Sequence, residues 1–228
     1  MMSLLTEGDG ITRVVALALL IMSVASWVLI LWKTSLLWRA SRSLPRSLAA
    51  FWQAADLDEA EQRLSVFDSA RLLLPLVRAA RLGDHHFEHQ PAASLGAQGD
   101  AAARCTRLLR DALQGVLSRL QHGQMVLASV GAVAPFVGLL GTVWAIYLAL
   151  VGLGGQGGAA QVGIEQISGP VGEALVITAA GLAVAIPAVL AYNALGRRIE
   201  HIEAELEGFA HDLRELVLQH AGATQGRP

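Results

Sequence analysis

Residues 125–195 read MVLASVGAVAPFVGLLGTVWAIYLALVGLGGQGGAAQVGIEQISGPVGEALVITAAGLAVAIPAVLAYNAL and contain only two charged side chains, Glu165 and Glu173. A glycine-rich segment, VGLGGQGG at 151–158, divides this stretch into two apolar runs. At about 1.5 Å per residue, a helix of roughly 20 residues crosses the hydrocarbon core of a bilayer. We therefore predict two membrane spans and an exposed loop between them, at 125–150, 170–195 and 151–169.

A third apolar run lies nearer the amino terminus, where residues 14–32 read VVALALLIMSVASWVLILW without a charge. This run is also long enough to cross the hydrocarbon core, so we predict a span here. The alternative, a cleaved signal peptide, would have a basic segment before a shorter apolar run of roughly 7–15 residues. Glu7 and Asp9 precede this run instead, which favours the span.

The composition is that of an integral membrane protein. Of 228 residues, 54% are hydrophobic and 16% are charged, and the mean hydropathy is +0.48; soluble domains have about 25% charged residues. The 17 basic and 19 acidic residues give a formal charge of −2. This balance argues against a nucleic-acid-binding protein, which would present a basic face. The single cysteine, Cys105, excludes an internal disulfide and a cysteine-based zinc site.

Basic residues near the ends of the spans set the expected orientation. The loop at 151–169 has no basic residue. Basic residues instead lie after the first span, before the second and after the third, at Lys33, Arg39, Arg42, Arg46, Arg119, Arg197 and Arg198. By the positive-inside rule we expect residues 1–13 to be periplasmic, and residues 33–124 and 196–228 to be cytoplasmic.

The cytoplasmic segments are expected to be helical. Apolar residues recur at helical spacing in 47–65 and 67–82, and again in 101–124, which leads into the second span without a strong stop signal. Residues 83–100 break the pattern and indicate a linker. The third span continues into an amphipathic helix at 197–219, which we expect to pack against the helix that leads into the second span. The predicted fold is an all-α membrane protein with three spans and long cytoplasmic helical extensions.

Small residues form one face of each of the last two spans. In the second span they recur at intervals of three and four, at Ala128, Gly131, Pro135, Gly138, Thr142, Ala145, Ala149 and Gly152. The third span has the same pattern, at Ala174, Thr178, Gly181, Ala185 and Ala188. Such faces let helices approach closely in a bilayer. Two interpretations stay open: contact between helices of one subunit, or the lining of a cavity shared between subunits.

Glu173 is the only charged residue within the last two predicted spans. A carboxylate inside a bilayer is costly and normally faces a bundle interior or water, which makes Glu173 a candidate for a proton pathway. The alternative is an interfacial position in the first helical turn, begun by Pro170, where a carboxylate suits the positive end of the helix dipole. Because these spans contain no Lys, Arg or His, a charge relay would need a group from another polypeptide.

Thr142 and Thr178 are predicted to lie at one depth near the middle of the membrane. Thr178 lies about 12 Å, and Thr142 about 15 Å, from the outer end of its own span. Both hydroxyls are therefore candidates for a proton pathway. The alternative is structural, since a threonine in a span often donates a hydrogen bond to a carbonyl one turn earlier.

Motifs for other chemistry are weak or absent. His85, His86 and His89 have a spacing that could bind a metal on a helix, but the surrounding Gly, Asp and Pro residues favour a solvated linker. The sequence has no phosphate-binding glycine loop, no GxSxG and no HExxH. The spans also lack the catalytic groups of an intramembrane protease. We expect no enzymatic activity, no metal and no cofactor.

Two segments resemble the signature spans of the ExbB/TolQ/MotA proton-channel family, and most of all its ExbB branch. They are APFVGLLGTVWAIY at 134–147 and GPVGEALVITAAGLAVAIPAVLAYN at 169–193. The first span, the cytoplasmic insertion and the helical tail agree in order and size with that family. The flagellar stator branch usually has four spans, whereas this chain has three. One departure is Val176 and Ile177 before Thr178, where the family pattern leads us to expect a smaller residue.

The resemblance implies a homopentamer in the bacterial inner membrane whose last two spans line a pore. It implies that the pore holds single-span helices of ExbD, which supply an essential Asp, and that proton flow energises TonB for uptake of siderophores and cobalamin across the outer membrane. By motif position, the resemblance makes Thr142, Glu173 and Thr178 pore residues. Two alternatives remain: a TolQ-type subunit of the Tol-Pal envelope system, and a passive membrane scaffold.

Overall fold

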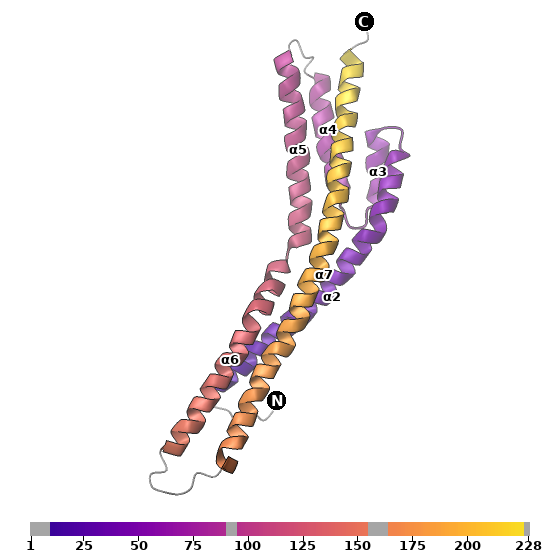
Figure 1. Cartoon of the computed structure of the whole chain (residues 1–228). Helices are drawn as coiled ribbons and strands as arrows, with labels where there is room; N and C mark the ends of the chain where they lie inside the picture. Colours follow the sequence, from indigo (N-terminus) through magenta and orange to yellow (C-terminus); the bar gives the residue numbers. More distant parts are fainter. Residues whose placement is uncertain (1–9, 90–94, 155–163, 226–228) are drawn as a thin grey trace. The chain divides into compact units, whose positions relative to one another are not determined.

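The computed structural model describes residues 10–89, 95–154 and 164–225, and side chains within 10–83, 102–152 and 168–219. The described residues form helices, with no strand among them, and Figure 1 shows their arrangement. In chain order the helices are α2 (Gly10–Trp52), α3 (Leu57–Phe67), α4 (Leu74–His89), α5 (Leu95–Gln121), α6 (Gln124–Gly154) and α7 (Ile164–Gln225).

Three apolar helical stretches are long enough to cross a membrane. They lie within Gly10–Trp52, Ala102–Gly152 and Ser168–Gln219, and so include α2, α6 and α7. A helix satisfies its backbone N–H and C=O groups internally, which is what a lipid environment demands. The prediction of an all-α membrane protein with three spans is confirmed.

Several helix ends differ from the prediction. The helix predicted at 47–65 is divided, because α2 ends at Trp52 and α3 begins at Leu57. Asp56 is the reason for the new start: its side chain accepts a hydrogen bond from the backbone N–H of Glu59 at 2.7 Å and caps α3. The linker predicted at 83–100 is shorter than expected, since α4 continues to His89 and α5 begins at Leu95.

The helix that leads toward the second span is interrupted, which corrects the prediction of a continuous helix. The break lies between Gln121, where α5 ends, and Gln124, where α6 begins. Gly123 has a φ of 85° there, a left-handed conformation that glycine adopts without a steric penalty and that commonly ends helices. By contrast, α7 is continuous, and it begins early enough that Pro170 lies beyond its first turn.

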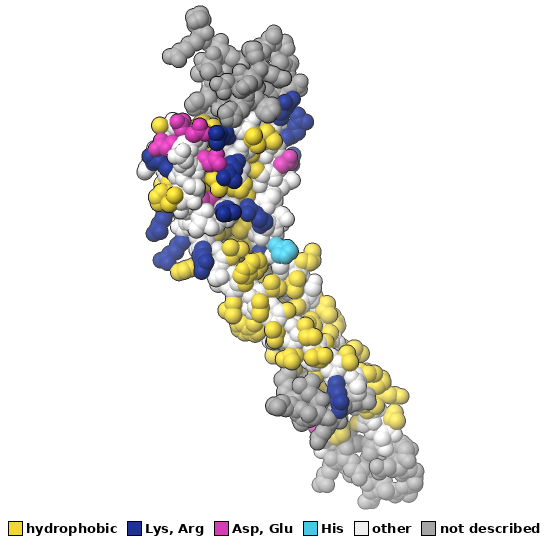
Figure 2. Space-filling model, turned by 180° about the vertical axis from the view of Figure 1, so that it is seen from behind, with side chains coloured by type: hydrophobic (Ala, Val, Ile, Leu, Met, Phe, Trp, Pro, Cys, Tyr) yellow, Lys and Arg dark blue, Asp and Glu magenta, His cyan; other side chains and the backbone are white. Residues whose placement is uncertain are grey.

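The chain forms two compact units. The first comprises Met1–Trp32 and Gly123–Ala194, and the second comprises Lys33–His122 and Leu195–Pro228. In Figure 2, hydrophobic side chains dominate the described surface of the first unit, and most of the charged side chains in view belong to the second. A surface as apolar as that of the first unit must be covered by lipid or by other spans.

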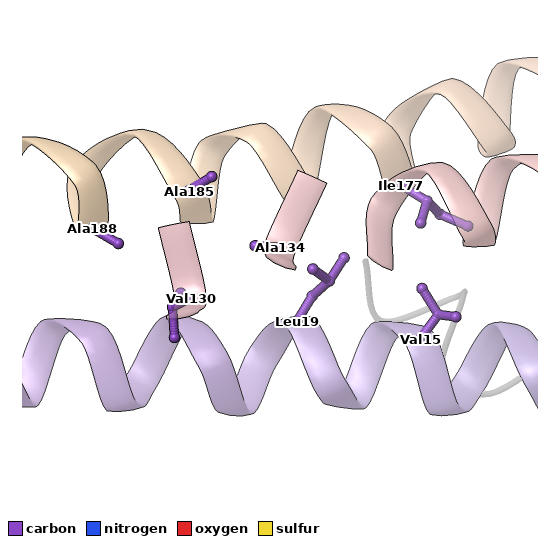
Figure 3. Close-up of a cluster of buried hydrophobic side chains, with 7 residues drawn as sticks. All are labelled: Val15, Leu19, Val130, Ala134, Ile177, Ala185 and Ala188. Atoms are coloured by element: carbon purple, nitrogen blue, oxygen red, sulfur yellow. The ribbon is translucent and has the colours of Figure 1, made fainter. Parts of the chain in front are cut away.

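The core of the first unit lies where α2 meets α6 and α7. Figure 3 shows Val15 and Leu19 of α2 pointing toward residues of these two helices, and the buried cluster is completed by Val130, Ala134, Ile177, Ala185 and Ala188. A Cβ added to Gly141 would meet Ile177 Cγ2 at 2.5 Å and Val15 Cγ1 at 2.9 Å. The absent side chain of Gly141 therefore makes room for Ile177, which explains how the chain accommodates a large residue before Thr178.

The core of the second unit is built from the amphipathic helices. The apolar residues that recur at intervals of three and four along this part of α7 are buried. They are Ile199, Ile202, Leu206, Phe209 and Leu213. The ring of Phe209 packs edge-on against that of Phe51 of α2, with 4.9 Å between centroids. Arg214 Nε of α7 donates to Thr106 Oγ1 of α5 at 2.8 Å, so these two helices lie side by side as predicted.

Candidate functional site

A pair of threonine hydroxyls lies between α6 and α7. Thr142 Oγ1 is in direct hydrogen-bond contact with Thr178 Oγ1, which confirms that the two residues share one level. The hydroxyl of Thr142 is also 3.1 Å from the carbonyl oxygen of Gly138 and 3.3 Å from that of Ala174. Thr178 Oγ1 lies 3.3 Å from the same Gly138 oxygen. The two side chains and two backbone carbonyls thus form one polar cluster within the apolar spans.

The hydroxyls can meet because the two helix backbones approach closely beside them. A Cβ added to Gly138 would lie 3.1 Å from the carbonyl oxygen of Ile177 and 3.2 Å from Gly181 Cα. A Cβ added to Gly181 would lie 2.7 Å from the carbonyl oxygen of Ala134, closer than real side chains come to backbone. Glycine is therefore required at position 181, and a larger residue at position 138 would force the neighbouring backbone to shift.

The cluster allows two directions of hydrogen bonding. Each hydroxyl has one proton to donate and can accept at its oxygen. In one arrangement Thr142 donates to Thr178, and Thr178 donates to the Gly138 carbonyl oxygen. In the other, Thr178 donates to Thr142, and Thr142 donates to the carbonyl oxygen of Ala174 or Gly138. A pair that can reverse its donors meets one requirement of proton relay through hydroxyls, and a donor and an acceptor of the proton would have to come from outside the pair.

Glu173 is exposed on α7 and is not part of this cluster. Five residues of helix place it about 140° around the axis from Thr178. Glu173 lies nine residues, or about 14 Å, after the start of α7 at Ile164. The favourable effect of a helix N-terminus on a carboxylate is confined to the first turn, so the helix dipole does not account for Glu173.

The small residues singled out in the sequence lie mostly at contacts within the first unit. Gly131 faces Val189, whose Cγ2 lies 2.5 Å from an added Cβ, and Gly138 faces Gly181. Ala185 and Ala188 belong to the buried core. Two others are half-buried on α6, at Pro135 and Ala145.

No metal site is found among the described side chains, where no three His, Cys, Asp or Glu residues come together. The three histidines of the candidate cluster belong to α4, but their side chains lie outside the described residues: His85, His86 and His89.

The sequence reasoning missed the burial of Lys33. This residue is 0% exposed, and its Nζ donates to the carbonyl oxygen of Leu120 near the end of α5. Burial lowers the pKa of this ammonium group, because removing a charge from water is unfavourable. The signal was present in the sequence, since Lys33 lies at helical spacing from the buried Leu37 and Leu44.

Comparison with known proteins gives consistent results. Residues 79–208 match the model of the MotA/TolQ/ExbB proton channel family. The chain is 39% identical to "Biopolymer transport protein ExbB" of Xanthomonas campestris pv. campestris (strain B100) over 92% of this chain and 83% of that protein. It is 35% identical to the protein of the same name from Neisseria meningitidis serogroup B, over 93% of this chain and 94% of that protein. It is 30% identical to "Tol-Pal system protein TolQ" of Pseudomonas aeruginosa, over 95% of this chain and 92% of that protein.

Proposed function

The chain belongs to the MotA/TolQ/ExbB proton channel family, and from this premise we propose that it is an inner-membrane proton-channel subunit of the ExbB type. In this role it couples the proton-motive force to biopolymer transport. The ExbB-named relatives of Xanthomonas campestris and Neisseria meningitidis support this branch, since they are 39% and 35% identical to the chain, compared with 30% for the TolQ of Pseudomonas aeruginosa.

The observation that carries the proposal is the isolation of Glu173. It is the only charged residue in the last two predicted spans, and it is exposed on the surface of the single chain. An intramembrane carboxylate requires water or a polar partner, and these spans contain no Lys, Arg or His to provide one. We propose that the partner group comes from another polypeptide or is water in a lumen.

The proposed assembly satisfies that requirement. Five copies of the chain surround a pore lined by α6 and α7, and single-span helices of ExbD inside the pore supply an acidic side chain. Glu173, Thr142 and Thr178 then form the proton pathway on this chain. The complex acts on TonB to energise the uptake of siderophores and cobalamin across the outer membrane. Further support comes from the Thr142–Thr178 contact, because a hydroxyl pair with reversible donors suits proton transfer.

The proposed orientation places the amino terminus and the loop at 151–169 in the periplasm. Residues 33–124 and 196–228 then lie in the cytoplasm. The basic residues support this arrangement, because they flank the inner ends of the spans and are absent from the loop.

The function is tested by deleting the gene in its own host and measuring two properties. We expect loss of receptor-dependent siderophore uptake with an intact outer membrane, restored by the wild-type gene, and co-purification of the chain with a single-span protein that contains Asp. A TolQ-type subunit would instead produce outer-membrane leakage and constriction defects with normal uptake. A passive scaffold would leave uptake intact in a chain with Glu173 replaced by glutamine.

A further inference from the structure

The turn between α3 and α4 exposes apolar side chains on the otherwise polar second unit. Val66 and Phe67, the last residues of α3, are 75% and 52% exposed. Arg71 follows in the turn, where it is exposed and has a φ of 52°. We propose that this turn lies in the headgroup layer of the membrane that the chain spans, with Val66 and Phe67 among the lipids and Arg71 against anionic headgroups. Side chains that are apolar or basic are typical of such interfacial contacts.

A hydrogen bond ties the turn to the end of the helix that precedes the second span. Arg119 Nη2 of α5 donates to the carbonyl oxygen of Arg71 at 3.2 Å, and both residues belong to the second unit. Arg119 precedes Met125, where the predicted span begins, by six residues. This short connection ties the turn to the part of the chain that enters the membrane. The proposal places the turn in the polar layer of the bilayer, which extends roughly 5–8 Å beyond each side of the hydrocarbon core.

The acidic groups near the turn are directed away from its surface. Asp68 is the only acidic residue between Gln62 and Val77, and it is 4% exposed. Its carboxylate accepts hydrogen bonds from three consecutive backbone N–H groups at 2.8–2.9 Å, those of Leu72, Leu73 and Leu74. The exposed surface of the turn therefore presents positive charge and apolar groups without a carboxylate. The basic side chain of the turn would attract an anionic lipid surface, and no exposed carboxylate of the turn would repel it.

The nearest acidic residue before the turn is Glu61, and its carboxylate is also engaged within the protein. Its carboxylate pairs with Arg78 Nε at 2.7 Å and with Arg81 Nη1 at 2.9 Å. The hydrogen bond from Arg78 is the main reason that the pKa of Glu61 lies below its usual value. Arg78 and Arg81 of α4 therefore balance the negative charge of Glu61. The exposed charge that remains at the turn is the positive charge of Arg71.

The portion of α2 in the same unit has the same character. Three exposed arginines occur there without an acidic partner among the described residues: Arg39, Arg42 and Arg46. The guanidinium of Arg42 lies 4.6 Å from the ring centroid of the exposed Trp38. Tryptophan and arginine just beyond a span are typical of the membrane–water interface, where anionic headgroups attract basic groups. This charge makes anionic lipid, rather than a second copy of the chain, the expected occupant.

The proposal is tested with a fluorophore at the turn of the full-length chain in lipid vesicles. Cys105 is first replaced by alanine, and a cysteine is then introduced by Phe67→Cys or, as a matched control, by Leu82→Cys. Leu82 is also a large apolar residue, 56% exposed, but lies on α4, away from the turn. Each cysteine is labelled with nitrobenzoxadiazole. Vesicles contain phosphatidylcholine alone or mixed with phosphatidylglycerol, with and without bromine on the acyl chains.

Brominated lipid quenches only fluorophores that reach the lipid. We expect a loss of emission from position 67 in brominated vesicles, a greater loss when phosphatidylglycerol is present, and no loss from position 82. Quenching at position 67 by aqueous iodide but not by brominated lipid would overturn the proposal, because the turn would then face water. Protection from both quenchers would also overturn it, since protein would then cover the turn. Two other outcomes would contradict a specific contact with anionic headgroups. One is equal quenching by brominated lipid at positions 67 and 82, and the other is quenching at position 67 that does not depend on phosphatidylglycerol.

Discussion

The hydroxyl of Thr142 meets that of Thr178 across the α6–α7 contact, although 36 residues separate the two in the sequence. Two backbone carbonyls, those of Gly138 and Ala174, complete the cluster and provide acceptors at both ends of the pair. One hydrogen-bond chain can therefore run in either direction between α6 and α7 without any change in the backbone. This property links the packing of the spans to the proposed transfer of protons.

Replacing either threonine by valine removes the hydroxyl while keeping the shape of the side chain. We expect Thr142→Val and Thr178→Val each to reduce uptake driven by the proton-motive force and to cost about 1 kcal/mol of stability, because one buried hydrogen-bonding group is lost. The partner should still co-purify, and Thr→Ser at the same positions should retain more activity. Uptake at the wild-type level in both valine variants would assign the pair a purely structural role.

Gly181 is predicted to tolerate no side chain, because an added Cβ would lie 2.7 Å from the Ala134 carbonyl oxygen. We expect Gly181→Ala to lower the thermal midpoint of the purified chain. The matched control is Gly172→Ala on the same helix, where no atom lies within 4 Å of an added Cβ. Gly138→Leu and Ala185→Leu should be more disruptive and should also impair partner insertion. Equal midpoints for the two alanine variants would contradict the close backbone contact.

The sequence was sufficient to predict the features that depend on periodicity and length. The three spans follow from uncharged runs, and the common level of Thr142 and Thr178 follows from counting residues along two antiparallel helices. The buried face of α7 follows in the same way, because its apolar residues recur at intervals of three and four.

The features that escaped prediction depend on single residues in three dimensions. Gly123 interrupts the path from α5 to α6, yet one glycine within a helical pattern is a weak signal for a break. The sequence pattern predicts an exposed charge beside the first span at Lys33, whereas the structure buries this residue against the end of α5. The role of Asp68 likewise depends on a turn whose geometry brings three N–H groups to one carboxylate.

Asp68 is expected to be important for the stability of the second unit. Asp68→Ala would leave three N–H groups at the start of α4 without their acceptor, and we expect a loss of about 1–3 kcal/mol. Asp56→Ala is the comparison, because Asp56 caps α3 through one exposed hydrogen bond at 2.7 Å. The thermal midpoint should fall more for Asp68→Ala than for Asp56→Ala. A larger effect of Asp56→Ala would contradict the capping role assigned to Asp68.

The proposed orientation predicts which side of the membrane can label an introduced cysteine. In a chain with Cys105→Ala, we expect Gly157→Cys to react with a membrane-impermeant maleimide added to the periplasmic side. Gly157 itself lies outside the described residues. Leu82→Cys, in the segment proposed to be cytoplasmic, serves as the opposite control and should react only after the inner membrane is opened. Labelling of Gly157→Cys from the cytoplasmic side alone would reverse the orientation.

Glu173 is predicted to be required for energy transduction but not for folding. Its side chain is exposed in the single chain and has no hydrogen-bond or ion-pair partner among the described residues, so Glu173→Gln removes no contact there. Glutamine keeps the volume and polarity but cannot titrate, which would interrupt proton transfer at this position. We therefore expect Glu173→Gln to purify with an unchanged thermal midpoint and with its partner, and to lose most uptake that depends on the proton-motive force. Glu173→Asp, which can still titrate, should retain more uptake than Glu173→Gln. Full uptake in the glutamine variant would exclude Glu173 from the proton pathway, whereas loss of the complex would assign it to assembly.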